Sequence, residues 1–461
     1  MSFRDALGAS LSFLSCIWIP GTLLCCIPWV QKQMLYLHNI TFFPGKWLDE
    51  PERAGFLNNQ VAPFTITTSD TEKLFAWLIT PLGVYAKHVD DFIKEQSVSI
   101  EDHLAFRLLR NDPDARLLLY FHGNSATIAQ ERRTIEYRSY SSGASEKMFI
   151  LAFDYRGFGK STGNPSEPGL LDDADAVIDW ALNTARISSD RIVLLGHSLG
   201  TAVVAGVAHR YAKREVEFAG LVLCAAFTNA GNAFSSYSVG GIVPVLAPLK
   251  LSGACQRWFS GRMRDTWRTD DRLAHLARTC PQFQLVLVHA EDDTTMPWHE
   301  TEALFQSTIK AAKEASLPIN GTDSTPEVVD MGEAGRQEVW KGGSRCITKM
   351  IAKHGGMYSI LPQSSIFIIL VVGLGYRDED LWIAPDRALH SAGPSFVSVA
   401  RVQITQCREK KDLTTALHHI RSVQIGYTSK RNHCHNASMT WSPVALTILQ
   451  VFGITAPVAH T

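Results

Sequence analysis

The stretch Ile192-Val193-Leu194-Leu195-Gly196-His197-Ser198-Leu199-Gly200 decides the fold of this chain. Four apolar residues are followed by the pattern Gly-x-Ser-x-Gly and then by small residues suited to a closely packed helix. Gly196 and Gly200 flank Ser198 because larger side chains would clash in a sharp strand-to-helix bend. The stretch therefore predicts a strand, a strained turn and a helix that present Ser198 as a nucleophile, in preference to a serine in an ordinary structural turn.

Short apolar runs recur on both sides of this stretch. They alternate with helical patterns, as at 169–182 and 199–211. Continuous apolar strands alternating with helices indicate an α/β fold with a mostly parallel sheet and helices on both faces. Functional sites in such sheets form at the carboxyl ends of the strands. The predicted strands lie at 74–79, 117–121, 148–153, 192–195, 221–224, 285–288 and 346–352.

A serine nucleophile needs two N–H groups that stabilise the oxyanion formed when it attacks a carbonyl. The N–H of Leu199, directly after the nucleophile, is the first predicted donor. The second comes from the loop His122-Gly123-Asn124-Ser125, which follows the strand 117–121. Asn124 is the candidate, and Ser125 is adjacent. His122 is assigned a structural role because it belongs to this loop.

The acid of a catalytic triad holds the histidine in its correct tautomer and stabilises the imidazolium. Three carboxylates, Glu291, Asp292 and Asp293, follow the strand 285–288 and compete for this role. No cysteine or histidine pattern has metal-ligand spacing, and the nine cysteines include no CxxC pair. The predicted chemistry needs neither a metal nor a cofactor.

Several motifs together give a closer resemblance. Residues 153–163 read Phe-Asp-Tyr-Arg-Gly-Phe-Gly-Lys-Ser-Thr-Gly. This motif, the 122–125 loop, Gly-His-Ser-Leu-Gly and the stretch 289–297 are considered together. They resemble the membrane-anchored monoacylglycerol and lysophosphatidylserine lipases of the α/β-hydrolase superfamily. The resemblance covers about residues 105–300. It implies hydrolysis of a monoacylglycerol or lysophospholipid ester through an acyl-enzyme. It favours Asp293, four residues before Pro297, as the acid, with Asp292 second.

The catalytic histidine departs from the family pattern. In the family a strand leads to Gly-Gly-His-Asn, but here Ala352-Lys-His-Gly-Gly356 is followed by Met357. The pair His435-Asn436 precedes Ser442-Pro443, a good helix start, and the apolar stretch 444–452. We assign the base to His435. His354 is the alternative, and a chain without a working histidine is the third reading.

Residues 357–434 therefore look like an insertion between the last strand and its histidine. We interpret the insertion as a translated intron, or else as an accessory segment. Loop-closure entropy rises slowly with length, so an insertion of this size still allows His435 to dock. If His435 does not dock, the chain is a catalytically impaired hydrolase fold that binds or scaffolds. A peptidase or thioesterase on the same fold is a further alternative.

The N-terminus carries a long apolar run. Residues 6–30 contain no charged side chain, which is long enough to cross a bilayer. We expect a single-pass anchor in residues 1–35, in the endoplasmic reticulum or another endomembrane. A signal peptide and a buried helix are the alternatives, and no A-x-A cleavage site follows the run. Asn39 and Asn320 begin glycosylation sequons that are compatible with a luminal catalytic domain.

Composition and segment order complete the prediction. The 461 residues are 46% apolar and 19% charged with a net charge of −1, which indicates a globular protein without a nucleic-acid partner. A substrate lid, or else a packed crossover, is predicted at 228–272. The expected segments are an anchor at 1–35, early strands at 36–104, a core at 105–356 that includes the lid and a polar excursion at 311–343, the insertion at 357–434 and a closing segment at 435–461.

Overall fold

The computed structural model describes residues 18–40, 46–142, 144–237, 246, 248–249, 252–315 and 325–355. Predictions about His435, the insertion at 357–434, the closing segment at 435–461 and the Asn320 sequon lie outside the described residues.

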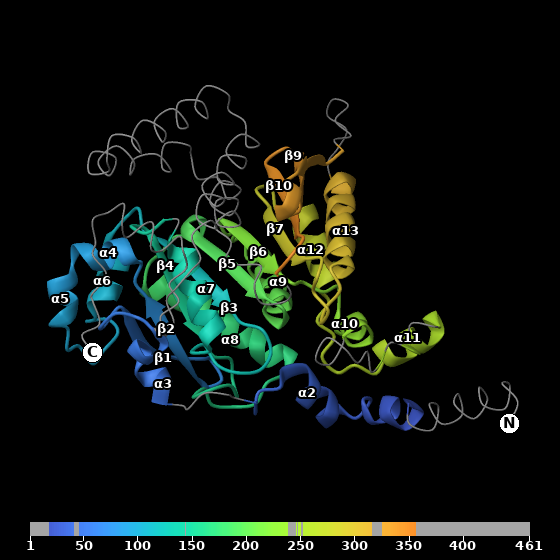
Figure 1. The fold of residues 1–461 in the computed structure, drawn as a ribbon, viewed down its shortest axis with the longest axis horizontal. Helices are drawn as coiled ribbons and strands as arrows, with labels where there is room; N and C mark the ends of the chain where they lie inside the picture. Colours follow the sequence, from blue (N-terminus) through green and yellow to red (C-terminus); the bar gives the residue numbers. More distant parts are fainter. Residues whose placement is uncertain are drawn as a thin grey trace, which may run out of the picture.

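Ten strands of the described chain form one twisted sheet through the middle of the molecule (Figure 1). The six central strands are all parallel, and antiparallel pairs extend both edges. All six therefore end at the same edge of the sheet. In spatial order the strands are β1 (Val61–Thr67), β2 (Lys73–Ile79), β4 (Met148–Phe153), β3 (Arg116–Phe121), β5 (Ile192–His197), β6 (Gly220–Cys224), β7 (Gln284–Ala290), β10 (Arg345–Ala352), β9 (Arg336–Gly342) and β8 (Glu327–Asp330).

The central strands are mostly apolar because both of their faces are covered. Along β5, Ile192 and Leu194 pack into one hydrophobic core, whereas Val193 and Leu195 pack into a second core on the opposite face. Alternation along a strand sends successive side chains to opposite faces. The predicted α/β fold with helices on both faces is confirmed, with a mixed sheet because its edges are antiparallel.

The helices divide between these two cores. Most of them contribute to the first core, among them α6 (Leu104–Asn111), α8 (Glu167–Asp179), α9 (Leu199–Ala212), α12 (Thr269–Thr279) and α13 (His299–Ala315). The second core takes residues from α3 (Lys46–Asp49) and α7 (Glu131–Ser142). The short helices α4 (Leu82–Lys87) and α5 (Val89–Ile93) connect β2 to α6. Short 3-10 turns lie at Pro51–Ala54, Ser189–Arg191 and Gly332–Ala334, and α8 ends in a π turn at Trp180–Thr184.

The polar stretch 311–343 contains more structure than its composition indicates. Helix α13 continues through Ala315, and β8 and β9 follow as antiparallel edge strands. Only Gln337 and Trp340 of these two strands are buried. A solvated edge strand carries polar side chains and charges, so its sequence reads like a loop. The excursion therefore extends the sheet in its described part.

The predicted lid region holds two short helices. Helices α10 (Ala230–Ser236) and α11 (Gly253–Ser260) lie between β6 and α12, and the rings of Phe234 and Phe259 meet edge to face 6.3 Å apart. Helix α11 projects from the body of the molecule (Figure 1). The lid function stays a prediction.

The described part of the N-terminal apolar run is not one continuous helix. Residues 18–24 are helical, a turn follows, and Pro28 begins α2 (Pro28–Tyr36). Proline suits a first helical position but interrupts a helix interior, which explains the break. Among the residues that the structure describes, no helix is both long and apolar enough to span a bilayer.

A buried cation joins the added edge to the rest of the sheet. Lys349 on β10 is 1% exposed and forms ion pairs with Glu302 of α13 and, at 2.7 Å, with Glu338 of β9. Its ammonium lies 4.5 Å from the ring centroid of Phe305. Removing one partner of a buried ion pair leaves the other charges uncompensated.

We expect Lys349→Ala to lower the free energy of unfolding by about 3 kcal/mol. The matched control is Lys87→Ala, which breaks the exposed pair with Glu146 and should cost under about 1 kcal/mol. Urea denaturation followed by circular dichroism measures both. Equal effects of the two substitutions would contradict the assigned role of Lys349.

Candidate active site

Ser198 occupies the strained turn that the sequence predicts. It lies between β5 and α9 with φ 51° and ψ −116°, a backbone conformation that costs a non-glycine residue energy and is found at nucleophile elbows. Its N–H donates to the Cys224 carbonyl at 2.9 Å, so the neighbouring strand holds the turn. The residue is 7% exposed.

The two glycines of the turn are required by close packing. A Cβ at Gly196 would lie 2.5 Å from the Gly200 carbonyl oxygen. A Cβ at Gly200 would clash with the Phe121 carbonyl oxygen at the end of β3. Helix α9 therefore begins directly against the end of β3, and this contact brings the next loop of the site beside the nucleophile.

That loop, residues 122–126, packs on the elbow. A Cβ at Gly123 would lie 3.3 Å from Ser198 Cβ, and the loop and Ser198 line the same small cavity. Among the described residues, the backbone N–H groups of Asn124 and Leu199 have no hydrogen-bond partner. Two N–H groups without partners beside a nucleophile have the composition of an oxyanion hole.

His122 is committed to the loop. Its Nδ1 donates to the Gly123 carbonyl at 2.6 Å, and its ring packs 4.3 Å from the Tyr155 ring. Burial, together with the nearby Arg133 charge, places the pKa of His122 well below its usual range, so the imidazole is neutral. Its Nε2 lies 3.5 Å from Asp154 Oδ1, and desolvation raises the pKa of Asp154 to about 7. This buried pair belongs to the scaffold under the loop.

The acid loop follows β7 at the same edge of the sheet. The Asp293 side chain is fully buried, and its Oδ1 accepts N–H bonds from Thr295 at 2.8 Å and Met296 at 2.9 Å. Its Oδ2 has no hydrogen-bond partner among the described residues. A buried carboxylate oxygen without a donor is costly. It is suited to accept the N–H of an imidazole that docks there.

His289 lies near this carboxylate but is already engaged. Its Nε2 donates to the Met296 carbonyl at 3.0 Å, and its Nδ1 lies 2.7 Å from Thr301 Oγ1. The distance from Nε2 to Asp293 Oδ2 is 3.3 Å. The ring is fully buried, so His289 braces the acid loop and is not placed to act as the base.

His354 lies away from the nucleophile. Its side chain is 76% exposed, and its Nδ1 lies 3.8 Å from Asp292 Oδ2. Asp292 is itself half exposed and accepts the Gly355 N–H at 3.2 Å. Neither Asp292 nor His354 lines the cavity at Ser198. Of the predicted site residues, the structure brings Ser198, Leu199 and Asn124 together and places Asp293 at the same sheet edge; His435 lies outside the described residues.

Two buried residues near the nucleophile do not follow from motif reasoning. Arg133 and Glu136 of α7 line the cavity with Ser198. Glu136 is fully buried and its carboxylate accepts the Tyr120 hydroxyl at 2.8 Å. The only sequence signal is a charged helix between two buried strands, which is equally typical of a solvated face.

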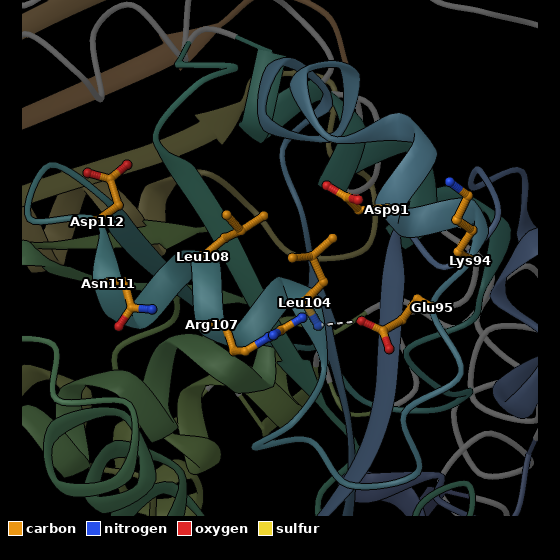
Figure 2. A pocket seen from close by; sticks show the side chains of 8 residues that line it. All are labelled: Asp91, Lys94, Glu95, Leu104, Arg107, Leu108, Asn111 and Asp112. Carbon is orange, nitrogen blue, oxygen red and sulfur yellow. Dashed lines mark hydrogen bonds between the residues drawn. The ribbon is translucent and has the colours of Figure 1, made fainter.

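One large groove lies away from this site. It has a volume of about 720 Å³ and lies between α5 and α6, with Leu104 and Leu108 between charged side chains (Figure 2). Glu95 accepts the Leu104 N–H at 2.8 Å across it. None of its lining residues belongs to the carboxyl edge of the parallel strands, so we place no catalysis there.

A serine in a strained strand-to-helix turn, beside unpaired N–H groups and a buried carboxylate after a later parallel strand, defines a serine hydrolase of the α/β type. Residues 118–334 match the alpha/beta hydrolase family, and the described chain has the α/β-hydrolase fold.

Individual known proteins are similar to this chain. The lysophosphatidylserine lipase of Xenopus tropicalis is 28% identical over 301 residues, which cover 63% of this chain and 68% of that protein. The lysophosphatidylserine lipase of Rattus norvegicus is 29% identical over 299 residues, 63% of this chain and 66% of that protein. A solved alpha-beta hydrolase from Vibrio vulnificus has a TM-score of 0.47 and 16% identity, over 77% of this chain and 93% of that one.

Glu136 makes the stability of this site dependent on pH. Burial raises the pKa of Glu136 to about 7, whereas a carboxyl group in the unfolded chain titrates near about 4.3. Between these values the folded state keeps a proton that the unfolded state has lost, so stability falls as pH rises through this window. We expect Glu136→Gln to flatten this fall, because the amide oxygen still accepts from Tyr120 but cannot ionise.

Melting temperatures of the wild type and Glu136→Gln at pH 5 and pH 8 test this expectation. The difference between the two pH values should be smaller in the variant. Asp154 titrates in the same window in both proteins, so some slope remains. An identical difference in the two proteins would show that Glu136 does not carry the proton.

Proposed function

We propose that the chain hydrolyses lipid acyl esters through an acyl-enzyme, with Ser198 as the nucleophile. The observation that carries the proposal is the strained, buried Ser198 at the same sheet edge as the Asp293 carboxylate, whose Oδ2 has no donor among the described residues. A serine hydroxyl reacts only when a base removes its proton, and the base needs an oriented partner. We propose Ser198 and Asp293 as the two ends of that relay.

The reaction follows from these positions. Ser198 Oγ attacks the ester carbonyl while the base takes its proton, and the N–H groups of Leu199 and Asn124 stabilise the oxyanion. The protonated base then donates to the leaving alcohol, and water releases the acyl group by the same route. Asp293 orients the base. The proposed cycle uses these groups and water, and it needs no cofactor or metal.

His435 is the proposed base. The Glu291 N–H donates to the Ala352 carbonyl at 2.8 Å, so the end of β10 lies directly beside the acid loop. A histidine that returns to the end of this strand from later in the chain would therefore lie next to Asp293. We propose that 357–434 is an insertion, either a translated intron or an accessory segment, that separates His435 from β10 in sequence without excluding it from the site.

The substrate class rests on the relatives. The chain spans about two thirds of the length of the lysophosphatidylserine lipases that it matches. We propose a monoacylglycerol or lysophospholipid as the substrate, in which one acyl ester must reach a buried serine. The lid at 228–272 would cover such an apolar chain, and Trp258 of α11 is 40% exposed there.

Reaction with a fluorophosphonate probe tests the nucleophile. Full-length protein should be labelled, and Ser198→Ala should abolish labelling because no other group attacks the phosphorus. Asp293→Asn should slow labelling on the order of 10⁴-fold through the wrong imidazole tautomer. Intact-protein mass spectrometry and in-gel fluorescence provide the readout.

The same assay separates the rival readings. His435→Ala should abolish rapid labelling, whereas His354→Ala should not change it. Deleting 357–434, which joins Gly356 to His435, should preserve or increase the rate. A folded wild type that is never labelled would instead support a catalytically impaired hydrolase fold. Turnover of peptides or thioesters in preference to lipid esters would reassign the reaction class.

We also propose that residues 1–35 attach the enzyme to an endomembrane. In the described part of this segment, large apolar side chains stand unusually exposed, led by Trp29 at 68%. Ile19, Leu23 and Leu24 are each about half exposed. A contiguous exposed apolar surface on a soluble body marks an interaction site, and a lipid substrate makes a bilayer the natural partner.

Deleting residues 1–27 should release the protein from lipid vesicles. The deletion removes the exposed apolar side chains up to Ile27, and Trp29→Ala in the same variant removes the most exposed one. Helix α2, which packs on the body, stays in place. Flotation with phosphatidylcholine vesicles measures binding, and retained fluorophosphonate labelling shows that the body is folded. A truncated protein that still floats would contradict the anchor.

A further inference from the structure

Arg133 of α7 lies buried beneath the loop that follows β3. It is 5% exposed, and its guanidinium donates to four backbone carbonyls of this one loop. Nη1 reaches the Thr127 carbonyl at 2.8 Å. Nη2 reaches the carbonyls of Gly123 at 3.2 Å, Asn124 at 3.3 Å and Ser125 at 2.9 Å. Because these four partners are all backbone oxygens, the guanidinium fixes the orientation of the peptide planes in the loop.

Each fixed carbonyl also fixes an N–H group. In a trans peptide the carbonyl of one residue and the N–H of the next point in opposite directions. In the Asn124–Ser125 peptide the oxygen faces Arg133, and the Ser125 N–H donates to the Tyr36 carbonyl at 2.9 Å. In the Ser125–Ala126 peptide the oxygen again faces Arg133, and the Ala126 N–H donates to the Ile40 carbonyl at 2.8 Å.

The Gly123–Asn124 peptide is the exception. Its oxygen accepts from Arg133 and from His122 Nδ1, but the Asn124 N–H has no partner among the described residues. This N–H is the only one of the three that remains available, and Gly123 packs on the Ser198 side chain. The charge on Arg133 also polarises the peptide, which makes its N–H a stronger donor.

We propose that Arg133 is the positioning residue of the oxyanion hole. It turns the Gly123–Asn124 peptide so that the Asn124 N–H stabilises the oxyanion formed at Ser198. The inference rests on the proposed serine hydrolase function and adds a residue that no motif indicates. Arg133 does not contact the reacting atoms, so its removal should lower kcat and leave KM nearly unchanged.

Lysine substitution at two positions of α7 tests this role. Lysine keeps the charge but cannot reach four carbonyls as a planar fork does. Arg133→Lys should lower kcat for p-nitrophenyl butyrate on the order of 10²-fold, the effect of losing one oxyanion donor, with KM changed less than about twofold. Arg138→Lys is the matched control: Arg138 is on the same helix and donates to the Ala54 carbonyl at 3.0 Å, away from the loop. It should change kcat less than about threefold.

Chemical rescue separates positioning from general support of the fold. Free guanidinium at millimolar concentration should restore part of the kcat of Arg133→Ala and should not raise that of Arg138→Ala. Circular dichroism and melting temperature confirm that each variant is folded. A merely structural role predicts a lowered melting temperature with no rescue of kcat.

The outcomes distinguish the role proposed for Arg133 from the proposed serine hydrolase function. If folded wild-type protein neither hydrolyses the ester nor reacts with the fluorophosphonate, both proposals fall together. If the wild type reacts and Arg133→Lys retains its kcat within about threefold, only the role of Arg133 is overturned. A variant with raised KM and unchanged kcat would likewise overturn it.

Discussion

The close approach of α9 to the end of β3 is the constraint on which the site depends. Gly200, in the first turn of α9, packs against the Phe121 carbonyl, and any side chain at this position would clash with that oxygen. Because the helix starts so close to the sheet, the residue before it must leave the strand at a positive φ, and that residue is Ser198. The strain at the nucleophile is therefore a consequence of packing between two regular elements. The surrounding cores, on both faces of the sheet, supply the stability that maintains it.

The same approach determines how the oxyanion loop can be built. Since β3 and β5 are parallel neighbours, the loop after β3 must leave the sheet over the elbow. This loop has few apolar side chains, so hydrophobic packing contributes little to its conformation. Its backbone groups are held instead from two sides, by the Arg133 guanidinium and by the carbonyls of Tyr36 and Ile40. The N-terminal segment therefore helps to hold the loop. Tyr36 is itself fixed, because its hydroxyl donates to Asp265 at 2.7 Å.

Most of the fold and part of the candidate site can be predicted from sequence patterns. Strands buried on both faces are continuous apolar runs, so β3 to β7 and β10 can be located from composition alone. Ser198 and the loop after β3 follow from the turn chemistry of glycine. The solvated edge strands β8 and β9 escape prediction because their side chains match those of a surface loop. The role of Arg133 cannot be predicted from sequence for a different reason. Its partners are backbone carbonyls, which every residue type carries, so no sequence pattern identifies them.

The choice among the three carboxylates shows where geometry adds most. Asp292 and Asp293 are adjacent in the turn after β7, but their side chains have different surroundings. Asp292 is near the surface, where it meets the Gly355 N–H, and Asp293 turns inward, where two N–H groups hold one of its oxygens. The Nε2–H of His289 donates to the Met296 carbonyl, so Asp293 Oδ2 has no hydrogen-bond donor among the described residues. We propose that this carboxylate oxygen, beside the end of β10, accepts the N–H of the histidine that completes the site.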